Sequence, residues 1–187
     1  MGLLMSWLNR GMNQAAAAVL EIKPSDHVLE IGFGPGHLIE LLVSAGAVQV
    51  AGIDHSPTML QAAKNRNSAA IARGKVDLRA GSVSALPWPD AWFDKAVAVN
   101  SFQFWPEPAH DLAEVRRVLK PGALLIIVIR GQKAGSNSRY AGADRGEEYL
   151  ARALQELEQT GFVEISHETR DAWPAPAICV RARKPPG

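Results

Sequence analysis

The segment at residues 28–37 reads VLEIGFGPGH, an apolar run that contains one carboxylate, Glu30, and then turns through three glycines: Gly32, Gly34 and Gly36. Glycines at this spacing allow a tight turn and leave no Cβ between the backbone and a ligand. A dinucleotide-binding turn would place its third glycine at position 37, where this chain has His37. A carboxylate beside the turn would repel a pyrophosphate and attract an ammonium or sulfonium centre. The pattern therefore favours a cationic cofactor.

A second carboxylate, Asp54, ends the next β-rich run, about 20 residues after the turn, in AGIDHS. A carboxylate at this spacing can accept hydrogen bonds from both hydroxyls of a ribose. This feature suits a nicotinamide cofactor and an adenosyl cofactor equally. The five histidines and the single cysteine, Cys179, show no close Cys or His spacing, so no metal is expected.

Strand and helix signals alternate along most of the chain. Short β-rich runs cover residues 27–33, 48–53, 76–80, 93–99 and 123–130, and helical stretches cover residues 37–44, 57–73, 109–119 and 147–159. Nearly all-apolar strands alternating with helices indicate a parallel sheet buried on both faces. Two last strand candidates, at residues 162–170 and 177–184, are too close for a crossover helix and should pair antiparallel. We expect a doubly wound, Rossmann-like α/β fold, with ligands at the carboxyl end of the first strand.

Length and composition indicate one domain, residues 1–187, with 47% hydrophobic residues to build its core. Twenty Lys and Arg against nineteen Asp and Glu imply no broad basic surface, so the expected partner is a small molecule and no nucleic acid. The longest aliphatic run, residues 123–129, is far shorter than the roughly 20 residues of a membrane span. No secretory signal is visible, and we expect a cytoplasmic protein.

Four ordered motifs between residues 28 and 129 carry a family resemblance: EIGFGPG, GID, SVSALPWPDAWFDKAVAVN and RRVLKPGALLIIV. Together they resemble class I S-adenosylmethionine-dependent methyltransferases, in the small-molecule branch that includes ubiquinone- and menaquinone-biosynthesis-like enzymes. The resemblance implies a seven-stranded sheet, which the terminal hairpin would complete, and S-adenosyl-L-methionine as the cofactor. It also implies methyl transfer to a small acceptor.

The cofactor-binding residues implied by the resemblance are Glu30, Gly32, Phe33, Gly34, Gly36, Asp54, His55, Met59, Gly81, Ser82, Val83 and Asn100. The glycine turn and Glu30 would hold the methionine end, and Asp54 the ribose. Residues 81–83 would hold the adenine, with His55 and Met59 on its side. Many relatives carry an Asp where this chain has Ser82, so the hydrogen bond to adenine should be weaker here. Asp94 also matches a family position, but it precedes its strand, and we interpret it as structural.

The acceptor would lie among segments that converge on the ligand face. Their aromatic side chains predict a pocket for a flat or apolar acceptor, lined by Trp7, Phe102, Phe104, Trp105, Tyr140 and Trp173. Because the cofactor is already activated, positioning can carry much of the catalysis, and the sequence identifies no catalytic residue. If the acceptor must lose a proton, the candidates by residue type are His110, Tyr140 and His167.

Two segments are expected to cover the site. The glycine-rich connection at residues 131–146 is long for a compact domain and follows a strand at its carboxyl end, so it is predicted to be a mobile lid. Residues 1–26 are predicted to form a helical cap on the other side.

Three other functions remain open. A non-catalytic S-adenosylmethionine-binding sensor or partner subunit would carry the same cofactor motifs. An NAD(P)-dependent oxidoreductase would share the sheet and Asp54, but it conflicts with Glu30, His37 and the terminal hairpin. Methylation of RNA or protein is disfavoured by the near-neutral charge, by the short chain and by the absence of a [DN]-P-P-[YF] motif after the fourth strand.

Overall fold

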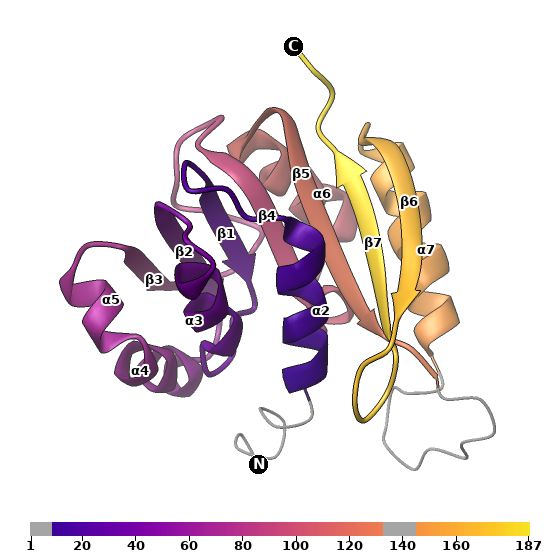
Figure 1. Cartoon of the computed structure of the whole chain (residues 1–187). Coiled ribbons are helices and arrows are strands. Elements are labelled where there is room, and N and C mark those ends of the chain that lie inside the picture. The colour runs from indigo at the N-terminus through magenta and orange to yellow at the C-terminus, as the bar shows by residue number, and fades with distance from the viewer. Residues whose placement is uncertain (1–8, 133–144) are drawn as a thin grey trace.

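The computed structural model describes residues 9–132 and 145–187, which form one seven-stranded sheet with helices packed on both faces (Figure 1). The strands are β1 (His27–Ile31), β2 (Gln49–Asp54), β3 (Val76–Ala80), β4 (Phe93–Val99), β5 (Leu119–Arg130), β6 (Val163–Arg170) and β7 (Ala177–Arg183). The helices are α2 (Arg10–Leu20), α3 (His37–Ser44), α4 (Pro57–Arg66), α5 (Ser68–Ala72), the 3₁₀-helix η1 (Phe102–Phe104), α6 (Pro108–Val118) and α7 (Gly146–Gln159). The predicted doubly wound α/β fold is confirmed.

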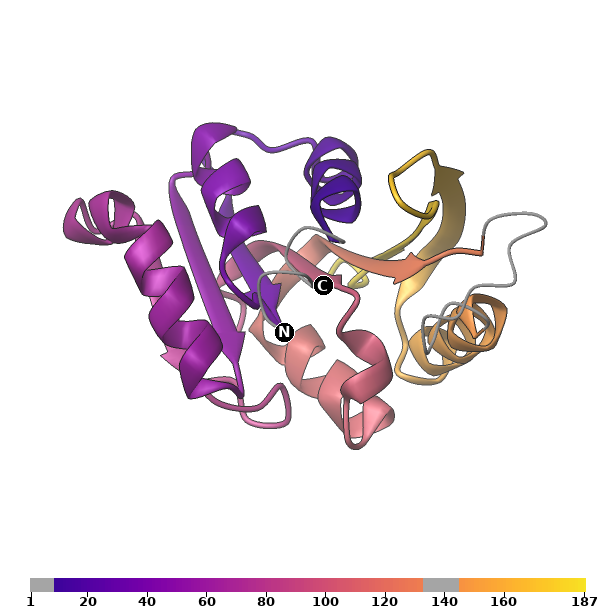
Figure 2. The same ribbon diagram turned by 90° about the horizontal axis from the view of Figure 1, so that it is seen from below.

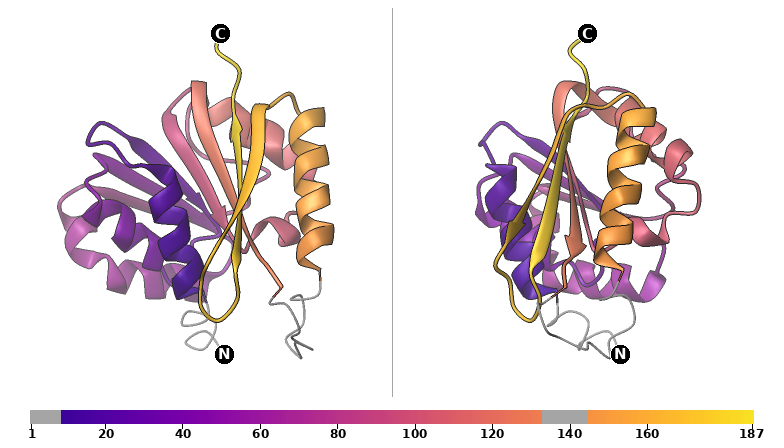
Figure 3. Two further views of the ribbon diagram at one scale, coloured as in Figure 1. Left: turned by 45° about the vertical axis from the view of Figure 1, so that its right-hand side comes forward. Right: turned by 90° about the vertical axis from the view of Figure 1, so that its right-hand side faces the viewer.

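The sheet has the strand order β3-β2-β1-β4-β5-β7-β6. The five strands from β1 to β5 run parallel, whereas β7 lies between β5 and β6 and is antiparallel to both. The predicted terminal hairpin is therefore present, and Figure 3 shows its two strands along one edge of the molecule. The chain winds outward from β1 to β3 and then returns to the other side of β1. This reversal places the topological switch point between β1 and β4.

Each face of the sheet has its own hydrophobic core because successive strand side chains point to opposite faces. Along β5, Ile127 and Ile129 pack in one core, while Ile126 and Val128 pack in the other. The first core lies under α6 and α7, and the second lies under α2, α3, α4 and α5, as the view in Figure 2 shows. A strand that is apolar at every position is thus explained by burial on both faces.

Some element boundaries differ from the prediction. The helix expected over residues 57–73 is two helices, α4 and α5, which meet at Asn67. Asn67 is buried, and its side-chain amide donates to the carbonyl oxygens of Gly36, outside both helices, and of Ala63 in α4. The run expected to reach residue 33 ends at Ile31, because Gly32 has a φ of 77° and leaves the extended conformation. Strand β5 begins at Leu119, which the pattern assigned to the preceding helix.

Helix α2 is a core element within the segment predicted to be a cap. Its residues Met12, Val19 and Leu20 are almost fully buried against the sheet. The ammonium of Lys95, in β4, donates to the carbonyl oxygens of Leu20 at 2.7 Å and Glu21 at 2.6 Å, and it pairs with an Asp26 oxygen at 2.8 Å. A cation at the carboxyl end of a helix satisfies its last carbonyls and its dipole. Lys95 therefore ties the end of α2 to the centre of the sheet.

The described ranges contain neither a candidate membrane helix nor a candidate metal site. None of the helices there is long and apolar enough to cross a membrane. No group of three or more His, Cys, Asp or Glu residues in residues 9–132 and 145–187 could hold a metal ion. The cysteine, Cys179, is buried in β7, and burial raises the pKa of its thiol to about 11. A thiol with this pKa is a poor nucleophile near neutral pH.

Candidate active site

The carboxyl ends of β1 and β4 meet at the switch point and are tied to each other. Ser101 follows β4, and its hydroxyl donates to the carbonyl oxygen of Ile31 at 2.8 Å. The Gly32 N–H donates to the Ile53 carbonyl at 2.8 Å, which joins the turn to β2 as well. Asn100, between β4 and Ser101, has a φ of 50°, a conformation that non-glycine residues rarely adopt outside constrained sites. This edge is the place where doubly wound sheets bind ligands.

Each glycine of the turn has a different reason to be glycine, although all three have a positive φ. A Cβ on Gly32 would lie 2.6 Å from the Cβ of Ser101. A Cβ on Gly36 would lie 2.7 Å from the side-chain nitrogen of Asn67. A Cβ on Gly34 would meet nothing within 4 Å, so this residue presents bare backbone to open space. Gly34 is thus the point of the turn that a ligand can approach most closely.

The far side of the turn is held by the junction of α4 and α5. The buried Asn67 amide donates to the carbonyl oxygens of Gly36 at 3.1 Å and Ala63 at 3.0 Å. Arg66 donates from Nε to the Pro35 carbonyl at 3.0 Å. At the junction of the two helices, the Asn67 side chain therefore bonds to the glycine turn and fixes its position.

Asp54 holds the near side of the turn. One carboxylate oxygen accepts the Gly34 N–H at 2.8 Å, and the other accepts the Ser56 N–H at 2.9 Å. Each carboxylate oxygen retains further acceptor capacity, so both can still accept from ribose hydroxyls. The side chain is only 7% exposed and is fixed by two backbone donors. This double role in the turn was not visible in the sequence, which suggested only the ribose.

Glu30 lies beneath the turn as a buried carboxyl group. Its Oε2 has no hydrogen-bond partner within the described residues. Burial raises its pKa well above the ordinary value, the negative charge of Asp54 raises the pKa further, and the Ile39 N–H lowers it. A buried oxygen without a partner is costly, and a nearby ammonium or sulfonium centre would offset that cost.

The loop after β3 lies directly beside Asp54. Ala80 pairs with Asp54 in the sheet, and the Gly81 N–H donates to the Asp54 carbonyl at 3.0 Å. In this loop Ser82 is exposed and Val83 is buried. The structure thus brings residues 81–83, the segment predicted to hold the adenine, next to Asp54, the residue predicted to bind the ribose.

Two other residues of the predicted adenine side flank the same edge. Met59 is half-buried in the first turn of α4, where its N–H donates to the capping Ser56 hydroxyl at 3.3 Å. The His55 side chain is 87% exposed, with Nδ1 3.9 Å from Asp54. Phe33, also in the predicted set, is buried in the core under α3 and contributes packing at the turn.

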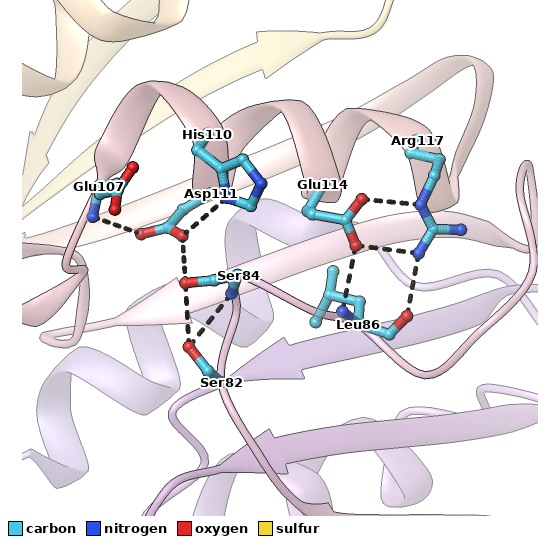
Figure 4. Close-up of polar contacts among 8 residues, drawn as sticks. All are labelled: Ser82, Ser84, Leu86, Glu107, His110, Asp111, Glu114 and Arg117. Carbon is cyan, nitrogen blue, oxygen red and sulfur yellow. Dashed lines mark hydrogen bonds and ion pairs between the residues drawn. The ribbon is translucent and has the colours of Figure 1, made fainter.

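A polar clamp, defined here as Ser82, Ser84, Asp111, Glu114 and Arg117, joins the same loop to α6 (Figure 4). The Ser84 hydroxyl donates to Asp111 at 2.6 Å. Glu114 accepts the Leu86 N–H at 3.2 Å, and Arg117 donates to the Leu86 carbonyl at 2.9 Å. Sequence reasoning missed this clamp, because its two halves are some 27 residues apart in the chain and form no local pattern.

The predicted acceptor aromatics do not form one group. Phe102 and Trp105 are buried in the core, where their rings pack edge to face at 5.2 Å, so they do not line an open pocket in this structure. Phe104 is 73% exposed and Trp173 is 59% exposed. Trp7 and Tyr140 lie outside the described residues, as does most of the lid predicted at residues 131–146. Phe104 and Trp173 are therefore the exposed members of the set.

Two of the three candidate general bases, His110 and His167, lie within the described residues. The His110 side chain is 57% exposed on α6, with Nδ1 3.8 Å from Asp111. His167 is exposed on β6, the edge strand separated from β4 by β5 and β7. Tyr140 lies outside the described residues. The geometry adds no argument for a proton-abstracting residue.

A hollow of about 270 Å³ opens at the opposite end of the sheet, where Asp94 and Lys120 line it. Asp94 accepts the His27 N–H at 3.0 Å and pairs with Lys120 at 2.8 Å. These contacts join the amino ends of β1, β4 and β5. Asp94 lies within β4, at its amino end, and not before the strand as expected, but its contacts hold the sheet on the far side from the glycine turn.

Comparisons with known proteins identify the family of this chain. A family model described as a methyltransferase domain matches residues 29–127. The "Uncharacterized methyltransferase YdaC" of Bacillus subtilis is 28% identical over 185 residues, which are 98% of this chain and 97% of that protein. A demethylmenaquinone methyltransferase of Deinococcus radiodurans is 34% identical over 122 residues, which are 65% of this chain but only 50% of the relative.

A solved structure gives the same picture of the fold. The "SAM dependent methyltransferase from Aquifex aeolicus" superposes with a TM-score of 0.77 at 20% identity, over 95% of this chain and 92% of that chain. This similarity supports the Rossmann-like methyltransferase fold. The family match covers more than half of the chain and includes the glycine turn, Asp54 and the loop after β3. This chain belongs to the methyltransferase-domain family and is an S-adenosylmethionine-dependent methyltransferase.

Proposed function

We propose that this enzyme methylates a small aromatic or apolar molecule by in-line displacement, and that it acts mainly by positioning. When bound, S-adenosylmethionine supplies a methyl group already activated on a sulfonium. The residues of the chain bind and orient the two reactants and exclude water between them. No protein nucleophile is required.

The observation that carries the proposal is the pair of carboxyl groups at the glycine turn, where a Cβ on Gly34 would meet no neighbour within 4 Å. Asp54 bonds to the Gly34 N–H, and the unpartnered Glu30 oxygen lies within electrostatic range of Asp54. Two acidic groups at one turn favour a ligand with a positive centre and disfavour a pyrophosphate. These residues fit an adenosyl sulfonium.

Each part of this edge has a proposed task. Asp54 accepts from the ribose hydroxyls, residues 81–83 hold the adenine, and the turn with Glu30 holds the methionine end. Met59 and His55 flank the adenine, and Asn100 closes the methionine side at the end of β4. Two backbone N–H groups donate to Asp54, and the Asn67 amide donates to the Gly36 carbonyl. These bonds keep the edge rigid before the cofactor binds, which lowers the entropic cost of binding.

The acceptor class is supported by the exposed aromatics and by the relatives. Phe104 follows β4, and Trp173 lies in the connection between β6 and β7, so both come from segments at the carboxyl edge. Aromatic side chains commonly line sites that bind flat or apolar ligands. The relatives include a demethylmenaquinone methyltransferase and a 27-O-demethylrifamycin SV methyltransferase. A small aromatic acceptor agrees with each of these observations.

A methyl-donor turnover screen tests the proposal. Purified protein would be incubated with S-adenosylmethionine and panels of small phenols, naphthoquinols, amines and thiols, while release of S-adenosylhomocysteine is measured. We expect turnover in at least one aromatic panel and none with bulk RNA or protein. Tight binding of S-adenosylhomocysteine without turnover on any panel would contradict the proposal and favour a sensor or partner subunit.

A further inference from the structure

The loop after β3 contains a chain of hydrogen bonds whose direction is fixed by a buried carboxylate. Asp111 is 0% exposed, and its Oδ2 accepts the Glu107 N–H at 3.1 Å. Its Oδ1 accepts the Ser84 hydroxyl at 2.6 Å, and the Ser84 and Ser82 hydroxyl oxygens lie 3.1 Å apart. Figure 4 shows this series, the serine relay, running from α6 to the exposed Ser82.

The positions of the protons follow from counting donors. A carboxylate only accepts, so the single hydroxyl proton of Ser84 is committed to Asp111. In the contact between the two serines, Ser84 must therefore accept and Ser82 must donate. The Ser82 oxygen also accepts the Ser84 N–H at 3.2 Å. With its own proton committed, Ser82 can offer only an acceptor to anything that approaches from outside.

We propose that Asp111 is a specificity-determining positioning residue, which sets Ser82 through Ser84 as a hydrogen-bond acceptor for the exocyclic amino group of adenine. The inference rests on the proposed function, in which residues 81–83 hold the adenine. It explains how a neutral serine can act as an oriented acceptor in this loop. The buried carboxylate polarises the two hydroxyls and adds negative charge from behind the loop.

Replacing Asp111 by Asn should reverse the relay. The Glu107 N–H requires an acceptor, so the amide oxygen must face Glu107 and the amide nitrogen must face Ser84. Ser84 then accepts from Asn and donates to Ser82, which leaves the Ser82 proton free to point outward. The same loop would then present a donor, which suits the O6 carbonyl of an inosine ring and not the amino group of adenine.

The test is titration calorimetry with S-adenosylhomocysteine and S-inosylhomocysteine on the full chain and its variants. We expect the wild-type protein to bind S-adenosylhomocysteine about tenfold more tightly than S-inosylhomocysteine. This ratio corresponds to gaining one hydrogen bond with the adenosyl ligand and losing it with the inosyl ligand. In Asp111→Asn the preference should fall to about unity or reverse. In Ser84→Ala the Ser82 hydroxyl is free to rotate, and the preference should also approach unity.

Glu114→Gln is the matched control. Glu114 holds the same loop to the same helix through the Leu86 N–H, but it does not touch the two serines. It should change both affinities together and leave the preference as in the wild type. Thermal unfolding of every variant checks the fold, and Ser84→Ala carries the test if Asp111→Asn does not fold.

An unchanged preference in folded Asp111→Asn and Ser84→Ala, with normal S-adenosylhomocysteine binding in the wild type, would overturn the relay alone. A wild-type protein that binds neither ligand would overturn the proposed cofactor site, and the relay with it. A lost or reversed preference in both variants, with the control unchanged, would support the relay.

Discussion

Glu30 combines a structural cost with a proposed binding role. Its carboxyl is buried with one oxygen unpartnered, and burial raises its pKa far above the ordinary value of 4.5. Between 4.5 and the raised value, the folded protein keeps a proton that the unfolded chain has lost. Stability therefore falls as pH rises through this window. The proposed cofactor site thus retains a group that weakens the empty protein.

Glu30→Gln tests this account. The variant should lack the pH-dependent cost of Glu30, so its unfolding free energy relative to the wild type should increase as pH rises above 4.5. It should also weaken S-adenosylhomocysteine binding by about tenfold, because Glu30 can lose its proton beside the cationic end of the ligand and Gln cannot. Urea unfolding across this pH range and calorimetry measure the two effects. If the unfolding free energies of wild type and variant differ by the same amount at every pH, Glu30 does not have the pH-dependent cost assigned to it.

At the residue scale, the sequence identified groups whose spacing is local. The glycine turn and Glu30 lie within one short segment, and Asp54 follows at a regular distance set by one strand-helix-strand unit. Asn67 and Asp111 could not be found this way. Their partners are 31 and 27 residues away, and such contacts depend on how helices pack. Phe102 and Trp105 were predicted to line the acceptor pocket but are buried in the core, because residue type alone does not distinguish core packing from ligand contact.

At the scale of elements, Asp94 is a joint between strands. Burial alone would raise its pKa, but the His27 N–H and the Lys120 ammonium together lower it below the ordinary value of 3.8. A carboxylate with a lowered pKa stabilises the fold above its ordinary value, and this contribution is lost as pH falls through the folded-state value. The contribution belongs to the end of the sheet opposite the cofactor.

Asp94→Asn should therefore reduce stability without affecting binding. We expect a loss of about 1–2 kcal/mol at neutral pH, which shrinks as pH falls below 3.8, because the lost contacts are charge-assisted hydrogen bonds. Affinity for S-adenosylhomocysteine should stay within error of the wild type. Asp171→Asn, an exposed position, is the control and should change stability by less than about 0.5 kcal/mol. A clear loss of cofactor affinity in Asp94→Asn would refute the structural assignment.

The order of elements was predictable, and their exact ends were less so. Apolar strands alternating with helices indicated the buried parallel sheet, and the short DAWPAP connection indicated the antiparallel hairpin. The break at Asn67 was not predicted, because helical periodicity continues on both sides of it. The Asn67 side chain makes a tertiary hydrogen bond to the Gly36 carbonyl at this break, and local helix propensity does not predict such a contact.

At the scale of the whole molecule, the proposed acceptor side is assembled from distant parts of the chain. Phe104 comes from the centre of the sequence and Trp173 from the terminal hairpin, and both side chains are exposed. A third exposed aromatic residue, Trp92, is 41% exposed and packs edge to face on His27 at the amino ends of the strands. Trp92 is therefore a control for Phe104 and Trp173, because it is an exposed ring at the opposite end of the sheet.

Phe104→Ala and Trp173→Ala should each raise the KM for the acceptor, by about tenfold, because each would remove a large apolar contact. Affinity for S-adenosylhomocysteine should remain near the wild-type value. Trp92→Ala removes an exposed ring at the other end and should leave the KM unchanged. Steady-state kinetics with the acceptor found in the turnover screen measure these effects. An equal rise in KM for Trp92→Ala would show that the rings act through general stability.

The most direct test of the account is the calorimetric affinity of the wild type and of Asp54→Ala for S-adenosylhomocysteine, with NAD as the competing ligand class. We predict that the wild type binds S-adenosylhomocysteine and not NAD. Asp54→Ala should weaken this binding by about 1–3 kcal/mol, because the ribose and the Gly34 N–H lose a charged acceptor. Asp54→Asn, which keeps one acceptor oxygen, should lie between the two. Binding of NAD by the wild type, or unchanged affinity for S-adenosylhomocysteine in Asp54→Ala, would contradict the assignment of this edge to an adenosyl sulfonium.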